Sequence, residues 1–405
     1  MLLILGIITI IYTTIQILVY RDIRIPPVLL GIEFSILYFL ENAIGYDIYS
    51  EDMLYAFFLI GVIAFSIGFY VFRNIRIVCF KYKPLVRKEF VFNYKLINFM
   101  ISLADIYFVF ECIKMYQFVQ VNYVENYFTT LHRLYNYTEL FGRFNIYCIS
   151  LSIVCAVIFF IIEKNKMAGF TFLHSSFITL AYALMTTGRA QVLFPLIGYF
   201  VIWMYSENKI NYKKIIALLF GASVLFLFFL YTSSLKYSEI SDNSFFFLDQ
   251  IKVYLCSSMP AFIHWVKSSP ELLMGRNTFR FFFIILGANR EAFSIAQEFI
   301  ETEEFLTNIY TLYQYYASDY GLIYSLIIQF LIGGLYSYLY KYGRYYLKKS
   351  RKFIIVFGLY ALLFYPLAMQ YAGDFYSALL STWIQIIFWL WFFTRKCFMK
   401  EKCYG

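Results

Sequence analysis

Charged residues are scarce in this chain. Asp, Glu, Lys and Arg together make up 15% of the 405 residues, whereas hydrophobic residues make up 61%. A soluble protein needs a polar surface around its core, so this composition excludes a soluble globular domain and indicates an integral membrane protein. Uninterrupted apolar runs of about 18 to 22 residues fit helices that cross a bilayer. We therefore expect an all-α polytopic membrane protein.

Patterns that indicate other classes of protein are also missing. The seven cysteines contain no C-x-x-C pair, and His132, His174 and His264 lack the spacing of metal ligands. We therefore expect no disulfide framework, no metal and no cofactor. The first apolar segment has its basic residues, Arg21 and Arg24, after it rather than before it. Because a cleavable signal peptide has the opposite order of charge, we expect a retained first helix.

Apolar windows predict about eleven spanning helices. They cover residues 2–20, 26–44, 53–72, 96–113, 144–162, 168–187, 190–206, 214–232, 321–340, 353–371 and 375–394. Basic clusters at 73–88, 341–352 and 395–402 are expected on the cytoplasmic side, which places the amino terminus outside and the carboxyl terminus inside. The net charge of +9 then reflects an inner face that attracts anionic membrane lipid, and we expect no nucleic-acid partner.

Most residues outside these predicted spans belong to one outer loop. It covers residues 233–320, and a smaller outer loop covers residues 114–143. Within the large loop, the stretches 245–267 and 279–289 have apolar cores too short to cross a bilayer, which is typical of re-entrant or interfacial helices. We expect residues 1–405 to form a single integral membrane domain whose chemistry resides in the large loop.

Four arginines near the outer face are candidates for binding an anion. Arg276 and Arg280 are four residues apart and share a face if the segment is helical. Arg290 follows in the same loop, and Arg189 lies at the outer end of the sixth predicted helix. Guanidinium groups bind phosphate oxygens in pairs and remain charged, so these residues predict a phosphate clamp. The alternative is that each arginine reaches lipid headgroups or pairs with a nearby glutamate.

The last part of the large loop, residues 307–321, is rich in tyrosine and has the sequence TNIYTLYQYYASDYG. Its tyrosines at helical spacing are Tyr310, Tyr313, Tyr316 and Tyr320. Aromatic rings stack on the C–H faces of sugars, but a belt of interfacial tyrosines explains the same pattern and is the better explanation of the pattern alone. Asp319, at the outer end of a helix, could act as a general base or could pair with an arginine.

The order of these features resembles the Wzy-type O-antigen and capsule polymerases, which join oligosaccharide repeat units in bacterial envelopes. Two stretches carry the resemblance. One is TTGRAQVLFPLIGY at 186–199; the other is the tyrosine-rich segment followed by the glycine-containing helix LIYSLIIQFLIGGLYSYLY. A large outer loop with scattered arginines lies between them.

The resemblance implies a membrane glycosyltransferase of broad GT-C architecture, active on the outer face of the bacterial cytoplasmic membrane and needing no metal. Donor and acceptor would both be glycans linked to undecaprenyl diphosphate, with the growing chain moved from its carrier onto the non-reducing end of a single repeat unit. A separate chain-length regulator is the expected protein partner.

The resemblance also suggests roles for particular residues. Arg189, Arg276, Arg280 and Arg290 would hold the diphosphate, since a dianionic leaving group in a poorly hydrated site requires preorganised cations. The base that activates the sugar hydroxyl would be Asp319 or, as a second choice, His264, although His264 could equally be an ordinary interfacial histidine. The expected sugar contacts are Asn308, Tyr310 and Tyr313.

Two other functions remain open from the sequence. An O-antigen ligase or another lipid-linked glycan transferase would use the same lipid donor and a similar outer loop. A flippase or transporter for the lipid-linked unit would explain the carboxylates inside predicted spans, which are Glu33, Glu41, Asp105 and Glu111. Against a transporter, Asp105 and Glu111 are six residues apart and point to different faces of a helix, and there is no internal repeat of the transporter kind.

Overall fold

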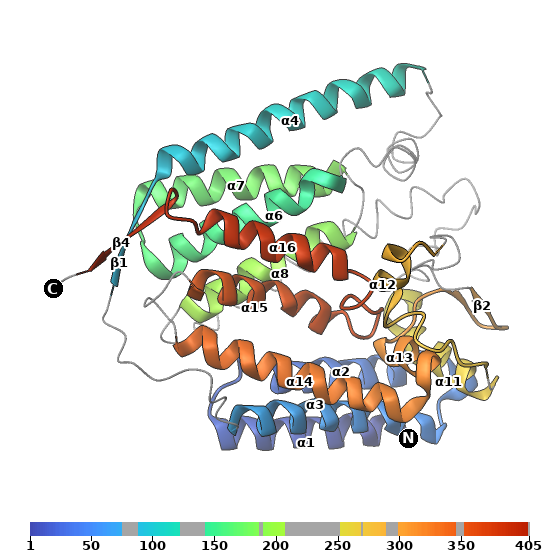
Figure 1. Ribbon diagram of the computed structural model, residues 1–405. Helices are drawn as coiled ribbons and strands as arrows, with labels where there is room; N and C mark the ends of the chain where they lie inside the picture. The colour runs from blue at the N-terminus through green and yellow to red at the C-terminus, as the bar shows by residue number, and fades with distance from the viewer. Residues whose placement is uncertain are drawn as a thin grey trace. The chain divides into compact units, whose positions relative to one another are not determined.

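Helices dominate the structure, a computed structural model (Figure 1). It describes residues 1–74, 88–121, 142–185, 189–206, 252–268, 270–288, 299–345 and 352–403. The long helices are α1 (Leu2–Tyr20), α2 (Pro26–Ile44), α3 (Ala56–Asn74), α4 (Tyr94–Val121), α6 (Gly142–Val157), α7 (Lys166–Met185), α8 (Arg189–Ser206), α14 (Leu322–Tyr345), α15 (Lys352–Ala368) and α16 (Leu380–Phe393).

Shorter elements connect these helices. The helical ones are two 3₁₀ turns, η1 (Asp47–Tyr49) and η2 (Met53–Tyr55), the π-helical turn η3 (Ile158–Ile162), and the helices α11 (Ser258–Lys267), α12 (Arg280–Ile285) and α13 (Leu312–Tyr320). The strands are β1 (Lys88–Phe92), β2 (Ile300–Glu301), β3 (Leu306–Thr307) and β4 (Met399–Cys403). β1 pairs antiparallel with β4, and β2 pairs antiparallel with β3.

The structure confirms a helical, multi-pass membrane protein. Among the described residues, 7 helices are long and apolar enough to cross a membrane. The remaining long helices, α8, α15 and α16, are apolar but shorter. The predicted span at 214–232 lies outside the described residues.

Two predicted boundaries are wrong. Helix α4 continues to Val121, beyond the span expected at 96–113 and into the smaller outer loop expected at 114–143. The span expected at 375–394 begins only at Leu380, in α16. The carboxylate of Asp374 accepts hydrogen bonds from the backbone N–H groups of Tyr376, Ser377 and Ala378. These bonds hold the residues before Leu380 in a turn. The apolar composition of the segment does not predict this turn.

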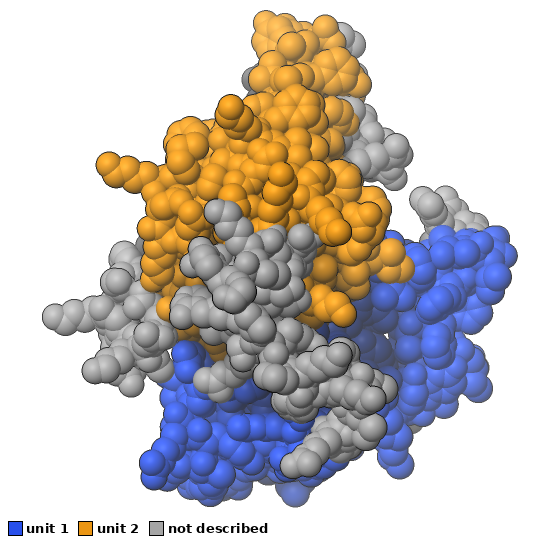
Figure 2. All heavy atoms as spheres, turned by 60° about the vertical axis from the view of Figure 1, so that its left-hand side comes forward, with its two compact units in different colours: residues 1–80, 245–341, 366–381 blue, residues 81–244, 342–365, 382–405 orange. Residues whose placement is uncertain are grey.

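The chain forms two compact units of interleaved sequence (Figure 2). Unit 1 comprises residues 1–80, 245–341 and 366–381, and unit 2 comprises residues 81–244, 342–365 and 382–405. Unit 1 therefore contains α1 to α3, most of α14, and the described parts of the large loop. The single integral membrane domain expected over 1–405 stays a prediction.

Helix α1 in unit 1 has the distribution of side chains expected at a lipid surface. After Leu2 and Leu5 near its start, its buried residues are small or polar, and they are Gly6, Thr9, Thr13 and Gln16. Its exposed residues include Ile4, Ile7, Ile11, Ile15 and Leu18. Small and polar residues favour close packing between membrane helices, and Gln16 donates a 3.1 Å hydrogen bond to Ser66 on α3. The apolar face is left for lipid.

Helices α3 and α14 pack closely within unit 1 because glycines lie at their contact. A Cβ atom on Gly68 would come within 1.9 Å of the carbonyl oxygen of Phe330, and one on Gly333 within 2.0 Å of that of Phe65. Only hydrogen fits at either position. This contact holds the middle of α14 against α3.

Helix α6 forms the buried centre of unit 2. Every residue from Tyr147 to Ile158 is buried. The sequence of this stretch, YCISLSIVCAVI, has no charge and many small side chains, which is typical of a helix surrounded by other helices. Its neighbours include α7, α8 and α4.

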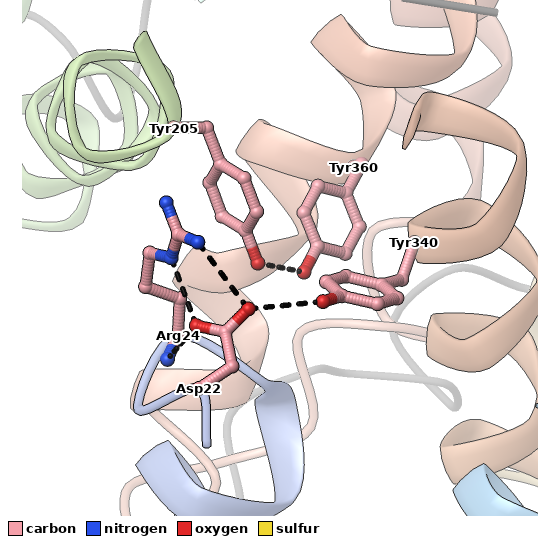
Figure 3. Close-up of polar contacts among 5 residues, drawn as sticks. All are labelled: Asp22, Arg24, Tyr205, Tyr340 and Tyr360. Atoms are coloured by element: carbon pink, nitrogen blue, oxygen red, sulfur yellow. Dashed lines mark hydrogen bonds and ion pairs between the residues drawn. The ribbon is translucent and has the colours of Figure 1, made fainter. Parts of the chain in front are cut away.

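Polar contacts also join helices within each unit (Figure 3). In unit 1, Asp22 accepts hydrogen bonds from Nε of Arg24 at 2.8 Å and from the hydroxyl of Tyr340 at 3.1 Å. These bonds attach the connection between α1 and α2 to α14. In unit 2, the hydroxyls of Tyr205 and Tyr360 lie 2.9 Å apart and join α8 to α15.

Candidate functional site

The short helices of the large loop gather at one end of unit 1. Figure 1 shows α11, α12 and α13 together at the end of the helices where the chain's amino terminus lies. Helix α11 contacts η1 and η2, which join α2 to α3, and α13 leads directly into α14. The candidate site is built on this end of the unit.

We call residues 273–280, LMGRNTFR, the arginine loop. Arg276 is exposed, and Arg280, the first residue of α12, is half-buried. The loop turns sharply at Met274 and Gly275, which have φ angles of 49° and 87°. A Cβ atom on Gly275 would also lie 2.5 Å from the hydroxyl of Tyr320, so both the backbone conformation and the space require glycine there.

Asp319 binds the arginine loop and is fully buried, with 0% of its surface exposed. Its Oδ1 accepts a 3.0 Å hydrogen bond from the backbone N–H of Asn277. Its Oδ2 accepts one from the backbone N–H of Thr278 at 2.7 Å and one from the hydroxyl of Thr278 at 2.6 Å. Both carboxylate oxygens are therefore occupied by the two residues that follow Arg276.

The arginine loop also caps the carboxyl end of α13. The last carbonyl groups of a helix have no partner within it and need donors from elsewhere. The N–H of Leu273 donates to the carbonyl of Ser318 at 2.7 Å, and that of Met274 donates to the carbonyl of Asp319 at 3.1 Å. The side-chain amide of Asn277 donates to the carbonyl of Tyr315 and the hydroxyl of Ser318. Loop and helix thus support each other.

An exposed apolar surface surrounds the arginine loop. It comprises Leu272, Met274, Phe279, Phe282, Ile285 and Leu286, of which Leu286 is 82% exposed. Helix α12 is too short to cross a membrane, and apolar side chains beside arginines are typical of a segment at the level of lipid headgroups. The surface suits the interfacial helix predicted at 279–289.

His264 lies in a second polar cluster, on α11. Its Nδ1 is 2.9 Å from the hydroxyl of Tyr49, and the ammonium of Lys267 lies over the ring of Tyr49 at 4.6 Å. Lys267 also pairs with Asp52. Burial alone would raise the pKa of Asp52, but the hydrogen bond and charge of Lys267, with the N–H of Leu54, lower this pKa below its usual value. The half-buried imidazole is thereby held beside a cation.

The three predicted sugar contacts occupy different environments. Asn308 is half-buried in the connection between β3 and α13. Tyr310 is buried against Tyr46 and Phe305. Tyr313 is completely buried, accepts a 2.9 Å hydrogen bond from Gln329, and packs against Phe34 and Phe58. Packing accounts for both tyrosines without a ligand.

The structure does not describe the side chains of the other two predicted arginines. Arg189 is the first residue of α8, in unit 2, and its side chain is outside the described residues. Arg290 lies in the segment 289–298, which is also outside them. Only Arg276 and Arg280 therefore share one described loop.

Unit 1 also contains a buried polar cluster that was not predicted from the sequence. The amide of Gln329 donates to the side-chain oxygen of Gln370, and the hydroxyls of Tyr336 and Tyr376 lie 3.0 Å apart. Nearby, the Tyr316 hydroxyl donates a 3.0 Å hydrogen bond to Asp374. The sequence feature that could have predicted this cluster is a glutamine inside each of two otherwise apolar stretches, LIIQFLIGG and PLAMQYAG.

Burial raises the pKa of Asp374 above its usual value, although hydrogen bonds from Ser377, Tyr376 and Tyr316 offset part of this effect. This carboxyl stabilises the turn before α16 and binds α13 through Tyr316. It is not accessible to a substrate in the conformation described.

No group of three or more His, Cys, Asp or Glu side chains among the described residues could hold a metal ion. A scan against protein-family models finds no matching model, and searches of curated proteins and of solved structures find no significant match. A proposal for the function therefore rests on the geometry of the arginine loop and of the His264 cluster.

Proposed function

We propose that this protein is a membrane glycosyltransferase that polymerises oligosaccharide repeat units linked to undecaprenyl diphosphate. In this proposal it acts on the outer face of a bacterial cytoplasmic membrane, with its amino terminus outside and its carboxyl terminus in the cytoplasm. The product is an O-antigen or a capsular polysaccharide, and a chain-length regulator acts beside it.

The observation that supports the proposal most strongly is the arginine loop. Arg276 is exposed on a loop that is hydrogen-bonded along its length, and it lies among apolar side chains suited to the membrane interface. A lipid diphosphate presents the complementary chemistry, with charged oxygens directly above an apolar chain. Arg276 and Arg280 would bind those oxygens through paired hydrogen bonds.

The transfer would proceed by displacement of the lipid carrier. A hydroxyl of the acceptor sugar forms a bond to the anomeric carbon of the donor glycan while the bond from that carbon to the diphosphate oxygen breaks. The electron pair leaves on the diphosphate, where the two guanidinium groups stabilise the added charge. The hydroxyl proton passes to a base.

His264 is the base that the geometry favours. Both oxygens of Asp319 accept hydrogen bonds from the arginine loop, whereas His264 is half-buried and, within the part of the chain that the structure describes, its Nδ1 contacts one hydroxyl, that of Tyr49. If Nδ1 carries the ring hydrogen and donates it to Tyr49, Nε2 is free to accept the sugar proton.

Complementation of a deletion strain tests the function. Surface polysaccharide is separated on a silver-stained gel after the deletion strain receives wild type, Arg276→Lys, Arg280→Lys or the control Arg395→Lys, each checked for membrane expression. We expect a ladder with wild type and with the control, whose Arg395 lies over the ring of Trp391. The deletion strain and at least one loop variant should give core with a single repeat, because a lysine cannot form the paired hydrogen bonds of arginine.

Other outcomes separate the rival functions. A ligase deletion would leave uncapped core, with polymer stranded on the lipid carrier. A transporter deletion would leave repeat units that never reach the outer leaflet. A full ladder in the deletion strain would exclude all of these functions for the protein, and full activity of both loop variants would remove the arginines from the mechanism.

One observation favours the transporter as a second candidate. Glu33, inside α2, has a buried Oε1 without a hydrogen-bond partner among the described residues. An ionisable group of this kind in a spanning helix is a candidate for a proton or ion pathway. By contrast, Asp105 pairs with His174 at 3.0 Å. Replacing Glu33 with Gln should abolish export of repeat units if the transporter proposal is right, and should leave the ladder intact otherwise.

A further inference from the structure

The buried carboxylate of Asp319 binds two consecutive residues of the arginine loop. We propose that Asp319 is the positioning residue of this loop: it orders the backbone so that Arg276 is presented to the diphosphate of a lipid-linked substrate. The identity of that substrate rests on the proposed function. The assignment of Asp319 as a positioning residue departs from the general-base role that the sequence suggested.

The hydrogen bonds of Asp319 restrict the backbone directly after Arg276. The carboxylate accepts from the N–H groups of two consecutive residues, Asn277 and Thr278, and from the Thr278 hydroxyl. Hydrogen bonds to a charged acceptor are shorter and stronger than neutral ones. Because Asn277 follows Arg276 directly, fixing its peptide group also fixes the direction in which the Arg276 side chain leaves the chain.

A second set of bonds on the other side of the loop acts together with Asp319. Leu273 and Met274 donate to the carbonyls of Ser318 and Asp319, so the residues before Arg276 are held as well. Arg276 is then the exposed residue between two attached segments. A loop ordered before the ligand arrives loses less conformational entropy on binding.

The same geometry shows which groups remain for an anion. Consecutive backbone N–H groups in a tight turn can themselves form an anion-binding nest. Here the N–H groups of Asn277 and Thr278 already bind the carboxylate of Asp319, which acts as an internal anion. Recognition of a diphosphate at this loop therefore depends on the guanidinium groups of Arg276 and Arg280.

A general base needs an unoccupied lone pair within about 3 Å of the proton that it removes. Asp319 is completely buried, and its two oxygens already accept three hydrogen bonds from the loop. To reach a sugar, it would have to release the loop that carries Arg276. Positioning and base catalysis by Asp319 are therefore alternatives, which an experiment can separate.

The experiment uses full-length protein in nanodiscs of neutral lipid, with undecaprenyl diphosphate as the probe. The variants are Asp319→Asn, Asn277→Ala, Arg276→Ala, the double variant Asp319→Asn with Arg276→Ala, and the control Glu271→Gln. Glu271 is an exposed carboxylate five positions before Arg276, so the control changes the same charge near the loop without touching the hydrogen bonds. Asn277→Ala loosens the loop more mildly, in case Asp319→Asn folds poorly.

Probe binding is measured on every variant, and trypsin cleavage is measured on the variants that keep Arg276. Binding of the probe reports on Arg276, and the rate of trypsin cleavage after Arg276, followed by mass spectrometry, reports on the order of the loop. We expect Asp319→Asn to weaken binding about tenfold, as for a lost contact to a charged group, and to speed cleavage by a similar factor. Arg276→Ala should weaken binding equally, and the double variant no further, since the two act through one interaction.

Three results would overturn the positioning role of Asp319 or separate it from the proposed function. Unchanged binding and unchanged cleavage in Asp319→Asn, with the ladder lost when this variant is tested by complementation, would restore the general-base role and exclude the positioning role. Additive losses of binding in the double variant would show that Asp319 does not act through Arg276. If Asp319→Asn speeds cleavage but wild type does not bind the probe, the positioning of the loop stands and the proposed function fails.

Discussion

The side-chain amide of Gln329 donates a 2.9 Å hydrogen bond to the hydroxyl of Tyr313, and both side chains are buried inside unit 1. The contact joins α14 to α13. It gives Tyr313, which the sequence suggested as a sugar contact, a role in packing that needs no ligand.

We therefore predict that substitutions of Tyr313 lower stability. Tyr313→Phe should cost about 1 to 3 kcal/mol, because it leaves a buried donor of Gln329 without this acceptor, and Tyr313→Ala should cost about 3 to 5 kcal/mol through the cavity. Thermal unfolding of detergent-solubilised protein measures both. Tyr320→Phe, at an exposed tyrosine of the same segment, is the control and should change stability little. An unchanged melting temperature with lost activity would favour the sugar-binding role.

Glycine at the contact of α3 and α14 leads to a second prediction. Gly68→Ala should destabilise the protein by about 1 to 3 kcal/mol, because the new methyl group would overlap a main-chain carbonyl that cannot rotate away. Gly6→Ala is the matched control, since the atoms nearest to its methyl group would belong to the ring of Phe39, at 3.2 Å, and not to the main chain. Size-exclusion chromatography after graded heating compares the two. Equal stability of both variants would mean that α3 and α14 do not pack as described.

The ion pair of Lys267 with Asp52 makes stability depend on pH. The pKa of Asp52 is lowered in the folded protein, so the pair stabilises the fold above the unfolded pKa, about 3.9, and the effect is lost as pH falls through the folded value. Lys267 is half-exposed, so the contribution should be only about 0.2 to 1 kcal/mol.

Lys267→Met should therefore lower the melting temperature at pH 7, and its difference from wild type should shrink as the pH approaches 3. Removing the acid first provides the control: in an Asp52→Asn background, Lys267→Met should have no such pH-dependent effect. A difference that persists unchanged at low pH would assign the effect to packing on Tyr49 instead.

Cysteine labelling tests the expected orientation. Cys397 is exposed and belongs to the basic segment predicted on the cytoplasmic side. A membrane-impermeant maleimide should modify it in inverted vesicles but not in intact spheroplasts, as read by mass spectrometry of the peptide. Buried Cys256 should stay unmodified in both, because burial and the neighbouring Glu41 raise the pKa of this thiol to about 12.

A cysteine introduced at Glu303, exposed in the β2–β3 connection of the large loop, is the matched control for that measurement. Glu303→Cys should react in intact spheroplasts. Labelling of Cys397 there instead would reverse the orientation and place the arginine loop on the cytoplasmic side, which is incompatible with polymerisation outside.

Much of the helical framework could be predicted because hydropathy is a local property. The apolar run predicted at 2–20 is α1, and that at 26–44 is α2, with the same bounds. The start of α16 could not be predicted, since a turn held by Asp374 replaces helix in a stretch of suitable composition. At the site, the spacing of Arg276 and Arg280 indicated a shared segment but not the loop geometry that exposes one of them.

The sequence alone determined that this is a multi-pass helical membrane protein, because the scarcity of charge and the length of the apolar runs leave no other way to bury so much apolar surface. Tertiary structure decided what individual polar residues do. Asp319 meets Asn277 and Thr278 across about forty residues of chain, and Tyr313 meets Gln329 from a neighbouring helix. A carboxylate that holds a loop and one that takes a proton have the same letter in a sequence, and only their partners distinguish them.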